Sequence, residues 1–340
     1  MHARVAASRS GFYNRRVHAP ASEFALIERH FRRPPRDASL RVGIGDDAAV
    51  FAPTPGHEIA VSVDMLVEGR HFFAGTDPTR LGHKTLAVNL SDLAAMGAVP
   101  RYALLAGALP DGDETWLAAF MTGFRALADA HDTELIGGDT TRGPRTLCVT
   151  VLGEVPAGGA ITRGGARPGD DVYVSGVLGG AALAVHALRG DVALPPGVLA
   201  AARERLERPQ PRVALGIALR GLATAALDVS DGLTGDLGHL LAASGCGARL
   251  DLARIPADPA LGALDARDAL ALRCLIAGGD DYELCFTAAP GDADRVAAAA
   301  RAGGAACTRI GAITAEQGLV VVGGDGAPLR ELPRAFDHFA

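Results

Sequence analysis

Short apolar runs of strand length alternate along the chain with longer segments in which apolar residues recur every three or four positions. The clearest helical segment is 77–97, where Asp77 suits an N-cap and Pro78 suits the first helical position. The same spacing predicts helices over 22–33, 113–131, 179–190, 198–206, a stretch after Pro211, 235–244 and 291–302. Strands are predicted over 41–51, 58–64, 102–109, 134–139, 146–155, 171–176, 224–232, 282–288, 307–313 and 318–324. This alternation predicts an α/β (α+β) fold.

The densest glycine and proline punctuation in the chain lies between 156 and 171. A segment of that kind between two α/β halves is typical of a domain boundary. The chain has 340 residues, about twice a usual domain of ~150 residues, so two compact domains fit its length. We expect a disordered tail over 1–21, an N-terminal domain over 22–160 and a C-terminal α+β domain over 161–340.

Charge and hydropathy argue against several classes of protein. The formal net charge is −6 and the arginines are scattered, so the chain lacks the basic stripe that follows a nucleic-acid backbone. No apolar run reaches the ~20 residues that span a bilayer, and no signal-peptide core is visible, so we expect a cytoplasmic protein without a membrane partner. The single lysine, Lys84, excludes a phosphate-binding loop of the GxxxxGK[ST] type. The five cysteines form no C-x-x-C pair and are expected to be buried, reduced thiols.

Aspartates stand where several predicted strands end. They are Asp46, Asp47, Asp64, Asp139, Asp228 and Asp231. In α/β folds ligands bind at the carboxyl ends of strands, and crowded carboxylates stay ionised only beside a cation. Oxygen donors without clustered histidine or cysteine suit Mg²⁺, which also binds substrate phosphates. One such aspartate alone can be a turn former or a helix cap, whereas several together indicate a metal site and phosphoryl chemistry.

A polar stripe runs along the predicted helix 77–97. Thr85, Asn89 and Asp92 follow i, i+4, i+7 spacing on a helix that otherwise carries Leu, Ala, Val and Met. The simplest alternative is a face in contact with solvent. Such faces are usually rich in Lys, Glu and Arg, and these short side chains favour an ion-binding or capping role instead.

Seven segments occur in the order found in one protein family. They are GIGDDAAV (43–50), SVDMLVEGRHF (62–72), KTLAVNLSDLAAMGA (84–98), LIGGDTTRGP (135–144), DVSDGLTGDLGHL (228–240), GGDDYELCFT (278–287) and FDHF (336–339). Together they resemble the thiamine-monophosphate kinases of the aminoimidazole-ribonucleotide-synthetase-like superfamily. The resemblance implies that ATP and thiamine monophosphate give ADP and thiamine diphosphate with the help of Mg²⁺. It also implies a two-domain synthetase-like fold and a homodimer in which the N-terminal mixed sheets of two copies join into a barrel.

The resemblance also implies roles for individual residues. The implied Mg²⁺ ligands and their neighbours are Asp47, Ser62, Val63, Asp64, Asp92, Asp139, Asp228 and Asp231. The implied nucleotide contacts are Gly138, Asp139, Arg163 and Ser230, and the implied thiamine-phosphate contacts are His71, Asp280 and Phe336. Two positions depart from the family pattern: GGDDYE stands where GGEDYE is frequent, and Phe336 stands where a larger aromatic residue is usual.

The implied reaction requires no dedicated catalytic base, because the attacking oxygen belongs to a phosphate monoester that is already anionic at neutral pH. Mg²⁺ held by aspartates offsets the repulsion between the two phosphates, in place of a phosphate-loop lysine. Within the GDD segment we expect Asp47 to bind metal and Asp46 to support the turn. Two alternatives stay open: another ATP-dependent synthetase of the same superfamily, and a nucleotide- and Mg²⁺-binding regulator without turnover.

Overall fold

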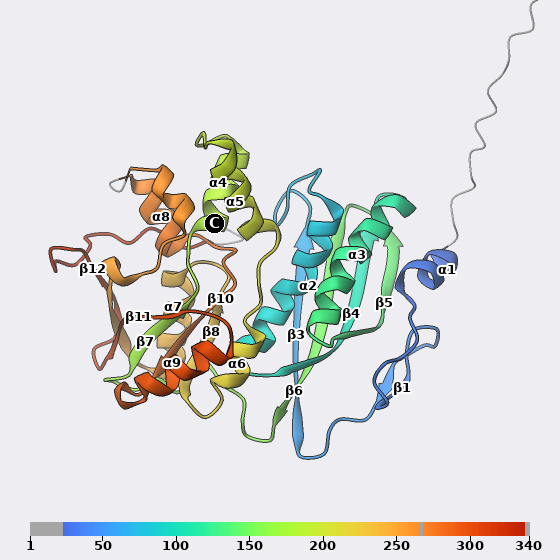
Figure 1. The fold of residues 1–340 in the computed structure, drawn as a ribbon, viewed down its shortest axis with the longest axis horizontal. Helices are drawn as coiled ribbons and strands as arrows, with labels where there is room; N and C mark the ends of the chain where they lie inside the picture. Colours follow the sequence, from blue (N-terminus) through green and yellow to red (C-terminus); the bar gives the residue numbers. More distant parts are fainter. Residues whose placement is uncertain (1–22, 266–267, 337–340) are drawn as a thin grey trace, which may run out of the picture.

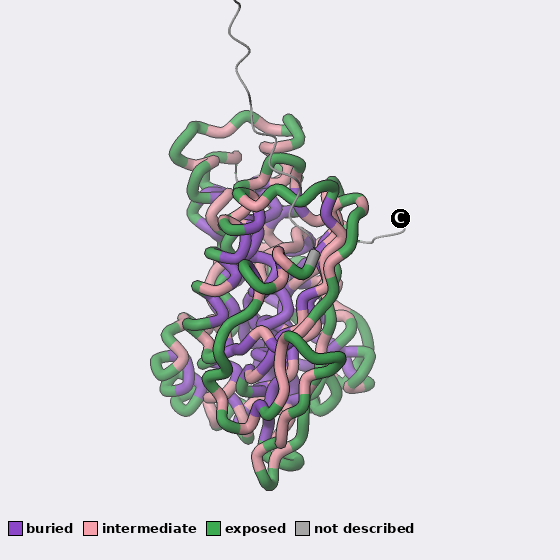
Figure 2. The backbone as a smooth tube through the Cα atoms, turned by 90° about the vertical axis from the view of Figure 1, so that its right-hand side faces the viewer, coloured by how far each residue is buried: buried purple, intermediate pink, exposed green. Residues whose placement is uncertain are grey.

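The computed structural model describes residues 23–265 and 268–336, and the tail expected over 1–21 lies outside the described residues. Two sheets stand side by side with helices around them (Figure 1). Buried residues follow the middle of the molecule, whereas exposed residues concentrate in peripheral loops (Figure 2). This mixed architecture in two parts confirms the predicted fold class. Within the described ranges, no helix is both long enough and apolar enough to cross a membrane.

The N-terminal sheet has the strand order β3-β6-β4-β5. Its strands are β3 (His57–Val67), β4 (Val99–Leu109), β5 (Glu134–Arg142) and β6 (Thr146–Pro156). The β4–β5 pair is parallel, and the other pairs are antiparallel. Helices α2 (Pro78–Ala95) and α3 (Glu114–Ala130) pack against each other and against this sheet. The predicted barrel would consist of two such sheets from two copies, so it stays a prediction.

The chain reaches this sheet through α1 (Glu23–Leu26), a π-helical turn (Ile27–Phe31) and a ribbon of two short strands. These strands are β1 (Leu40–Val42) and β2 (Val50–Phe51). The prediction of one continuous strand over 41–51 is therefore wrong. The backbone turns at Gly45, where φ is +118°, and the GDD segment forms a loop between the two strands.

The C-terminal sheet has the strand order β12-β9-β11-β7-β10-β8, and every pair except the parallel β12–β9 is antiparallel. Its strands are β7 (Asp171–Ser175), β8 (Ala223–Val229), β9 (Gly247–Asp251), β10 (Glu283–Ala288), β11 (Cys307–Thr314) and β12 (Gly318–Val322). The helices of this half are α4 (Gly180–Arg189), α5 (Pro196–Glu207), α6 (Val213–Ala218), α7 (Leu233–Ser244), α8 (Ala269–Ala277) and α9 (Ala293–Ala302). Short 3-10 turns cover Leu252–Arg254, Pro259–Ala263 and Pro290–Asp292.

Helix α2 lies between the two sheets. It contacts β3, β4 and β6 on one side and β8, β10 and α6 on the other. Its start is as predicted, because the Asp77 carboxylate accepts a hydrogen bond from the Arg80 N–H (3.0 Å) and Pro78 is the first helical residue. From Leu81 to Ala95 every residue except Asp92 is buried. Polar side chains on this helix must therefore find a partner in the interior or face a cavity.

Candidate active site

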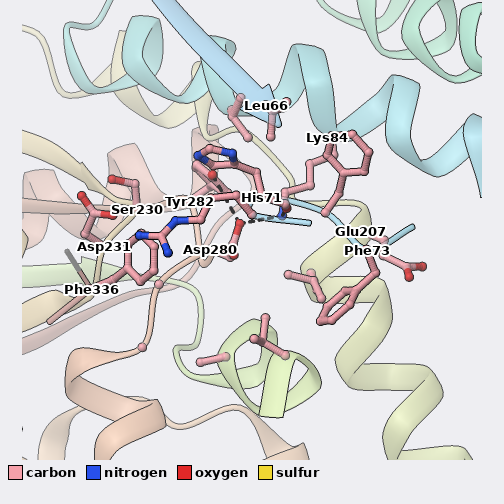
Figure 3. A pocket seen from close by; sticks show the side chains of 18 of the residues that line it. Leu66, His71, Phe73, Lys84, Glu207, Ser230, Asp231, Asp280, Tyr282 and Phe336 are labelled. Atoms are coloured by element: carbon pink, nitrogen blue, oxygen red, sulfur yellow. Dashed lines mark hydrogen bonds and ion pairs between the residues drawn. The ribbon is translucent and has the colours of Figure 1, made fainter. Parts of the chain in front are cut away.

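A cavity of about 720 Å³ lies between the two halves, beside α2. Its walls come from β3, the β3–α2 connection, α2, the segments that follow β8 and precede β10, and the C-terminal segment. Helices α4, α5 and α8 close the other side with side chains such as Val185, Leu206 and Cys274. Figure 3 shows residues from these distant parts of the sequence around one space.

Four of the five aspartates that line this cavity form one acidic group: Asp64 on β3, Asp92 on α2, Asp228 near the end of β8, and Asp231 just after it. The Ser62 hydroxyl donates a hydrogen bond to the Asp92 carboxylate. Ser62 and Asp64 alternate with outward-facing residues along β3, so both side chains point toward α2. The structure therefore brings together four of the aspartates that the sequence suggested as ligands of a cation.

Burial raises the pKa of three of these carboxyl groups. The pKa of Asp64 rises to about 6, mainly through burial and also through the charges of Asp92 and Asp231. The pKa of Asp228 rises to about 8, again through burial first and then through the charge of Asp92. Burial also raises the pKa of Asp92. A divalent cation would remove this penalty and keep the carboxylates ionised at neutral pH.

The donor set fits Mg²⁺ in chemistry, because it consists of carboxylate and hydroxyl oxygens. Within the described residues, no three acidic, histidine or cysteine side chains converge on a single ion position. The four carboxylates instead surround shared space and interact through their charges. This arrangement suits ions that keep water ligands and bind substrate phosphates, for which Asp64, Asp92, Asp228 and Asp231 are the candidate protein ligands.

Two members of the polar stripe on α2, Thr85 and Asn89, are buried, and the third, Asp92, faces the cavity. Thr85 Oγ1 donates to the carbonyl of Leu81 (2.7 Å), which satisfies it within its own helix. The Asn89 side-chain amide donates to the Thr85 carbonyl (3.0 Å), and its oxygen accepts the N–H of Asp64 (3.0 Å). Asn89 therefore ties α2 to β3 at the position where Asp64 enters the cavity.

His71 lies in the β3–α2 connection and lines the same cavity. Its Nδ1 accepts the backbone N–H of Val67 (3.0 Å), so a neutral ring carries its proton on Nε2. Its carbonyl accepts a hydrogen bond from Lys84 Nζ (3.3 Å). His71, an implied thiamine-phosphate contact, therefore reaches the cavity while its Nδ1 is satisfied by the backbone.

The loop before β10 brings Asp280 into the cavity from the C-terminal half. Its backbone is tied to the loop after β8, because the N–H of Asp280 donates to the Ser230 carbonyl and the N–H of Tyr282 donates to the Val229 carbonyl, each at 2.8 Å. Asp280 and Tyr282 adopt left-handed φ values of +69° and +51°, which non-glycine residues rarely take. Such strain at a cavity wall is typical of functional loops.

Phe336 is also at the cavity, near the end of the described chain. Its N–H donates to the Asp231 carbonyl (3.2 Å), and the Arg70 guanidinium carbon lies 4.9 Å from the centre of its ring. The rest of the FDHF motif lies outside the described residues. The C-terminal segment therefore lies beside Asp231 and contributes an aromatic ring to the cavity wall.

Six predicted site residues do not line the cavity. One of them, Ser62, lies directly behind it and donates to the Asp92 carboxylate. Asp47 lies in the exposed β1–β2 loop, where its N–H donates to the Asp46 carboxylate (2.9 Å). The Val63 side chain is exposed on the sheet face opposite Asp64. Gly138 and Asp139 lie on β5, three strands from β3, which is roughly 14 Å at ~4.8 Å per strand.

Arg163 is exposed and lies outside the cavity wall. Its positive charge opposes the burial that raises the pKa of Asp92, so it is near the acidic group. A structural reason is also visible for Gly138, because an added Cβ would lie 1.9 Å from the Leu105 carbonyl oxygen of β4. The roles of Asp47, Val63, Gly138, Asp139 and Arg163 in binding stay predictions.

Sequence reasoning missed Asp236, Tyr282 and the position of Lys84. Asp236 Oδ2 accepts the backbone N–H groups of Asp231 and Gly232, both at 3.0 Å, and so holds the loop that carries Asp231. An acidic residue in the first turn of a helix after an SDG turn is a recognisable signal for such a contact. Tyr282 and Lys84 gave no local signal, because their roles depend on segments far away in the sequence.

Comparisons with known proteins agree with this geometry. The model of the AIR synthase related protein N-terminal domain matches residues 45–155, and that of the C-terminal domain matches residues 167–324. The thiamine-monophosphate kinase of Escherichia coli K12 is 46% identical over 323 residues, which cover 94% of this chain and 98% of that protein. The chain belongs to the thiamine-monophosphate kinase family.

Solved structures of thiamine-monophosphate kinases and related proteins share the fold. The crystal structure of thiamine-monophosphate kinase from Stenotrophomonas maltophilia K279a is 47% identical, with a TM-score of 0.82 and coverage of 91% of this chain and 98% of that one. AaThiL complexed with AMPPCP and TMP is 27% identical, with a TM-score of 0.73 and coverage of 85% of this chain and 89% of that one. The family therefore includes a protein solved with both of these ligands bound.

Proposed function

We propose that this protein transfers the γ-phosphoryl group of ATP to thiamine monophosphate and forms thiamine diphosphate and ADP. The observation that carries the proposal is the similarity of nearly the whole chain to a thiamine-monophosphate kinase. The cavity agrees with it, because four carboxylates lie there beside the predicted substrate contacts. AMPPCP is a non-hydrolysable analogue of ATP, and its presence with TMP in a related structure supports the pairing of these two substrates.

The chain's residues divide the work of binding two anionic substrates. Asp64, Asp92, Asp228 and Asp231 would hold Mg²⁺. The bound ion would supply positive charge that offsets the repulsion, of several kcal/mol, between the two phosphates. Ser62 orients the Asp92 carboxylate through its hydroxyl. The acceptor oxygen is anionic from the start, so the cavity needs no general base to generate it.

The remaining contacts follow the location of each residue. His71, Asp280 and Phe336 line the cavity and are proposed to contact thiamine monophosphate. Ser230 lies next to Asp231 in the same wall and is proposed to contact the nucleotide. The other proposed nucleotide contacts are Gly138, Asp139 and Arg163, and Asp47 is proposed as a metal ligand.

We further propose that two copies associate through the open face of the N-terminal sheet. This face carries the exposed apolar side chains of Ile59, Val61, Val63 and Met65, which point away from α2. Across β6 and β4, Met65 is in register with Asp139 of β5. Residues in register point to the same face of a sheet, so Asp139, a proposed nucleotide contact, lies on the face that carries Met65. A contiguous apolar surface of this kind marks an interaction site. A cytoplasmic location is part of the same proposal.

The deciding experiment combines purified protein, ATP and Mg²⁺ with and without thiamine monophosphate, and measures ADP and thiamine diphosphate. We expect ADP release only with thiamine monophosphate, in equal amounts with thiamine diphosphate. A synthetase for another substrate would ignore thiamine monophosphate, and a regulator would bind ATP without consuming it. Either result would refute the proposal.

Asp92→Asn is the matched inactive variant, because it removes a candidate metal ligand and keeps the side-chain shape. We expect a loss of at least about 100-fold in kcat, in the range seen when one preorganised electrostatic group is removed. Arg309→Met serves as the control, since Arg309 pairs with Asp171 in the C-terminal sheet and does not line the cavity. Its kcat should stay close to that of the unmodified protein.

A further inference from the structure

Lys84 is the only lysine of the chain and one of the most deeply buried cations of the cavity wall. It lies on α2 with its side chain 3% exposed, so its ammonium needs partners in the interior. Nζ donates to the Asp280 Oδ1 atom (2.6 Å) and to the His71 carbonyl (3.3 Å). One ammonium group thus connects two proposed substrate contacts, one from each half of the molecule.

The Asp280 carboxylate is oriented by two donors on the same oxygen. Lys84 Nζ and the Tyr282 hydroxyl (3.4 Å) both donate to Oδ1. Within the described ranges, no side chain donates a hydrogen bond to Oδ2 of Asp280. The Asp280 side chain is 28% exposed and lies in the cavity wall. Figure 3 shows Asp280 between Tyr282 and Lys84, with His71 beside it. The second carboxylate oxygen is therefore available to a ligand.

We propose that Lys84 is a positioning residue that acts on thiamine monophosphate through Asp280. Its ammonium fixes the Asp280 carboxylate so that Oδ2 faces the cationic, N–H-bearing thiamine part of the substrate. The same ammonium holds the His71 carbonyl, so the loops from the two halves keep one relative position. This inference rests on the proposed kinase function, and it assigns a role to a residue outside the set expected from the sequence.

A direct role in phosphate binding fits the geometry less well. A lysine that binds phosphate presents a mobile, accessible ammonium group to the ligand. Lys84 is buried and already donates to two oxygens, and its carboxylate partner is 2.6 Å away. Tyr282, which shares Asp280 Oδ1, is partly buried in the cavity wall. Its pKa is raised, first by burial and then by the charges of neighbouring aspartates that include Asp64, Asp228 and Asp231. Lys84 and Asp280 therefore form a wall beside the acidic group and leave that group for the metal and phosphates.

The test is a double-mutant cycle with Lys84→Met, Asp280→Asn and the double variant. Loss of a hydrogen bond to a charged group raises KM for thiamine monophosphate by about 10- to 100-fold in each single variant. We expect KM for ATP to change by less than about twofold, because the acidic group is untouched. Because Lys84 acts through Asp280, the double variant should have the same KM for thiamine monophosphate as Asp280→Asn alone.

Lys84→Gln is made in parallel for the case that Lys84→Met does not fold. Glutamine keeps a hydrogen-bond donor at this position but not the charge. His83→Gln is the matched control, because His83 is the buried neighbour on α2 that contacts the Pro209 carbonyl (2.8 Å) and does not line the cavity. Thermal unfolding of each variant separates loss of fold from loss of substrate binding.

Three results would overturn the inference. An unchanged KM for thiamine monophosphate in a folded Lys84 variant would show that Lys84 does not position the substrate site. Equal increases in both KM values would indicate a general structural role, and additive effects in the double variant would indicate direct contact between Lys84 and substrate. Absence of thiamine-monophosphate-dependent ADP release in the unmodified protein would instead refute the kinase proposal itself, and the inference with it.

Discussion

The exposed face of the N-terminal sheet gives the most direct test of the proposed homodimer. On β3, Ile59, Val61, Val63 and Met65 are 37%, 60%, 58% and 55% exposed, which amounts to about two complete apolar side chains in contact with solvent. At ~1.5–3 kcal/mol per side chain, covering them contributes about 3–6 kcal/mol per copy. A two-fold interface uses the same face twice, which gives about 6–12 kcal/mol per dimer before the cost of association.

Val61→Asp is the sharpest perturbation of this face, because Val61 is the most exposed of the four. The change removes about 1–2 kcal/mol of apolar burial per copy and places two carboxylates in the interface, at several kcal/mol per ion. A total loss of at least about 4 kcal/mol weakens the dimer by at least about 1000-fold, because each ~1.4 kcal/mol is a factor of ten.

Size-exclusion chromatography with light scattering, run over a dilution series, measures this shift. Val320→Asp is the matched control, since Val320 on β12 is 39% exposed but lies in the other sheet. We expect Val61→Asp to be a folded monomer at dilutions where the unmodified protein and the control are dimers. A Val61→Asp dimer as stable as the unmodified one, or an unmodified protein that is monomeric at all concentrations, would show that this face is not the interface.

Three further substitutions test the site and the core. Asp228→Asn should abolish measurable kinase activity but raise Tm in EDTA between about pH 4 and 8. The pKa of the Asp228 carboxyl is 3.8 in the unfolded chain and about 8 in the folded protein. The unmodified protein therefore loses stability as pH rises through that window. Thermal scans against pH should show this difference vanish below pH 4. Glu283→Ala leaves the buried Arg212 guanidinium without its carboxylate and should cost about 3–5 kcal/mol in urea unfolding, whereas Arg309→Met, at a more exposed pair, should cost at most about 1 kcal/mol. Gly123→Ala would place a Cβ 1.7 Å from a backbone carbonyl oxygen of α2 and should lower Tm by forcing α2 and α3 apart, and an unchanged Tm would show that their contact is not tight.

Elements with a strong local pattern were predictable from the sequence, and elements without one were missed. Helix α2 begins at Pro78 as predicted, since the cap and the first proline are local signals. β9 (Gly247–Asp251) and α8 (Ala269–Ala277) were not predicted. β9 is short and lies between β11 and β12, so its strand character comes from pairing with distant segments that periodicity does not reveal.

The same distinction applies to the candidate site. The aspartates were visible as residues at strand ends, and the structure places Asp64, Asp92, Asp228 and Asp231 around one cavity. That the GDD loop lies outside this cavity in a single chain was not visible, because it depends on the position of the β1–β2 ribbon. A sequence indicates which side chains are suited to bind an ion, but the tertiary structure decides which of them meet.

Helix α2 explains why the core and the site of this protein cannot be separated. It fills the space between the two sheets, and it also carries Lys84, Asn89 and Asp92 to three different partners. Asn89 fixes β3 where Asp64 enters the cavity, and Lys84 fixes the loop of Asp280 from the other half. Buried polar groups of this kind contribute little net stability, but each is costly when its partner is removed. The helix therefore sets the relative position of the two halves through contacts that the chemistry of the cavity also requires.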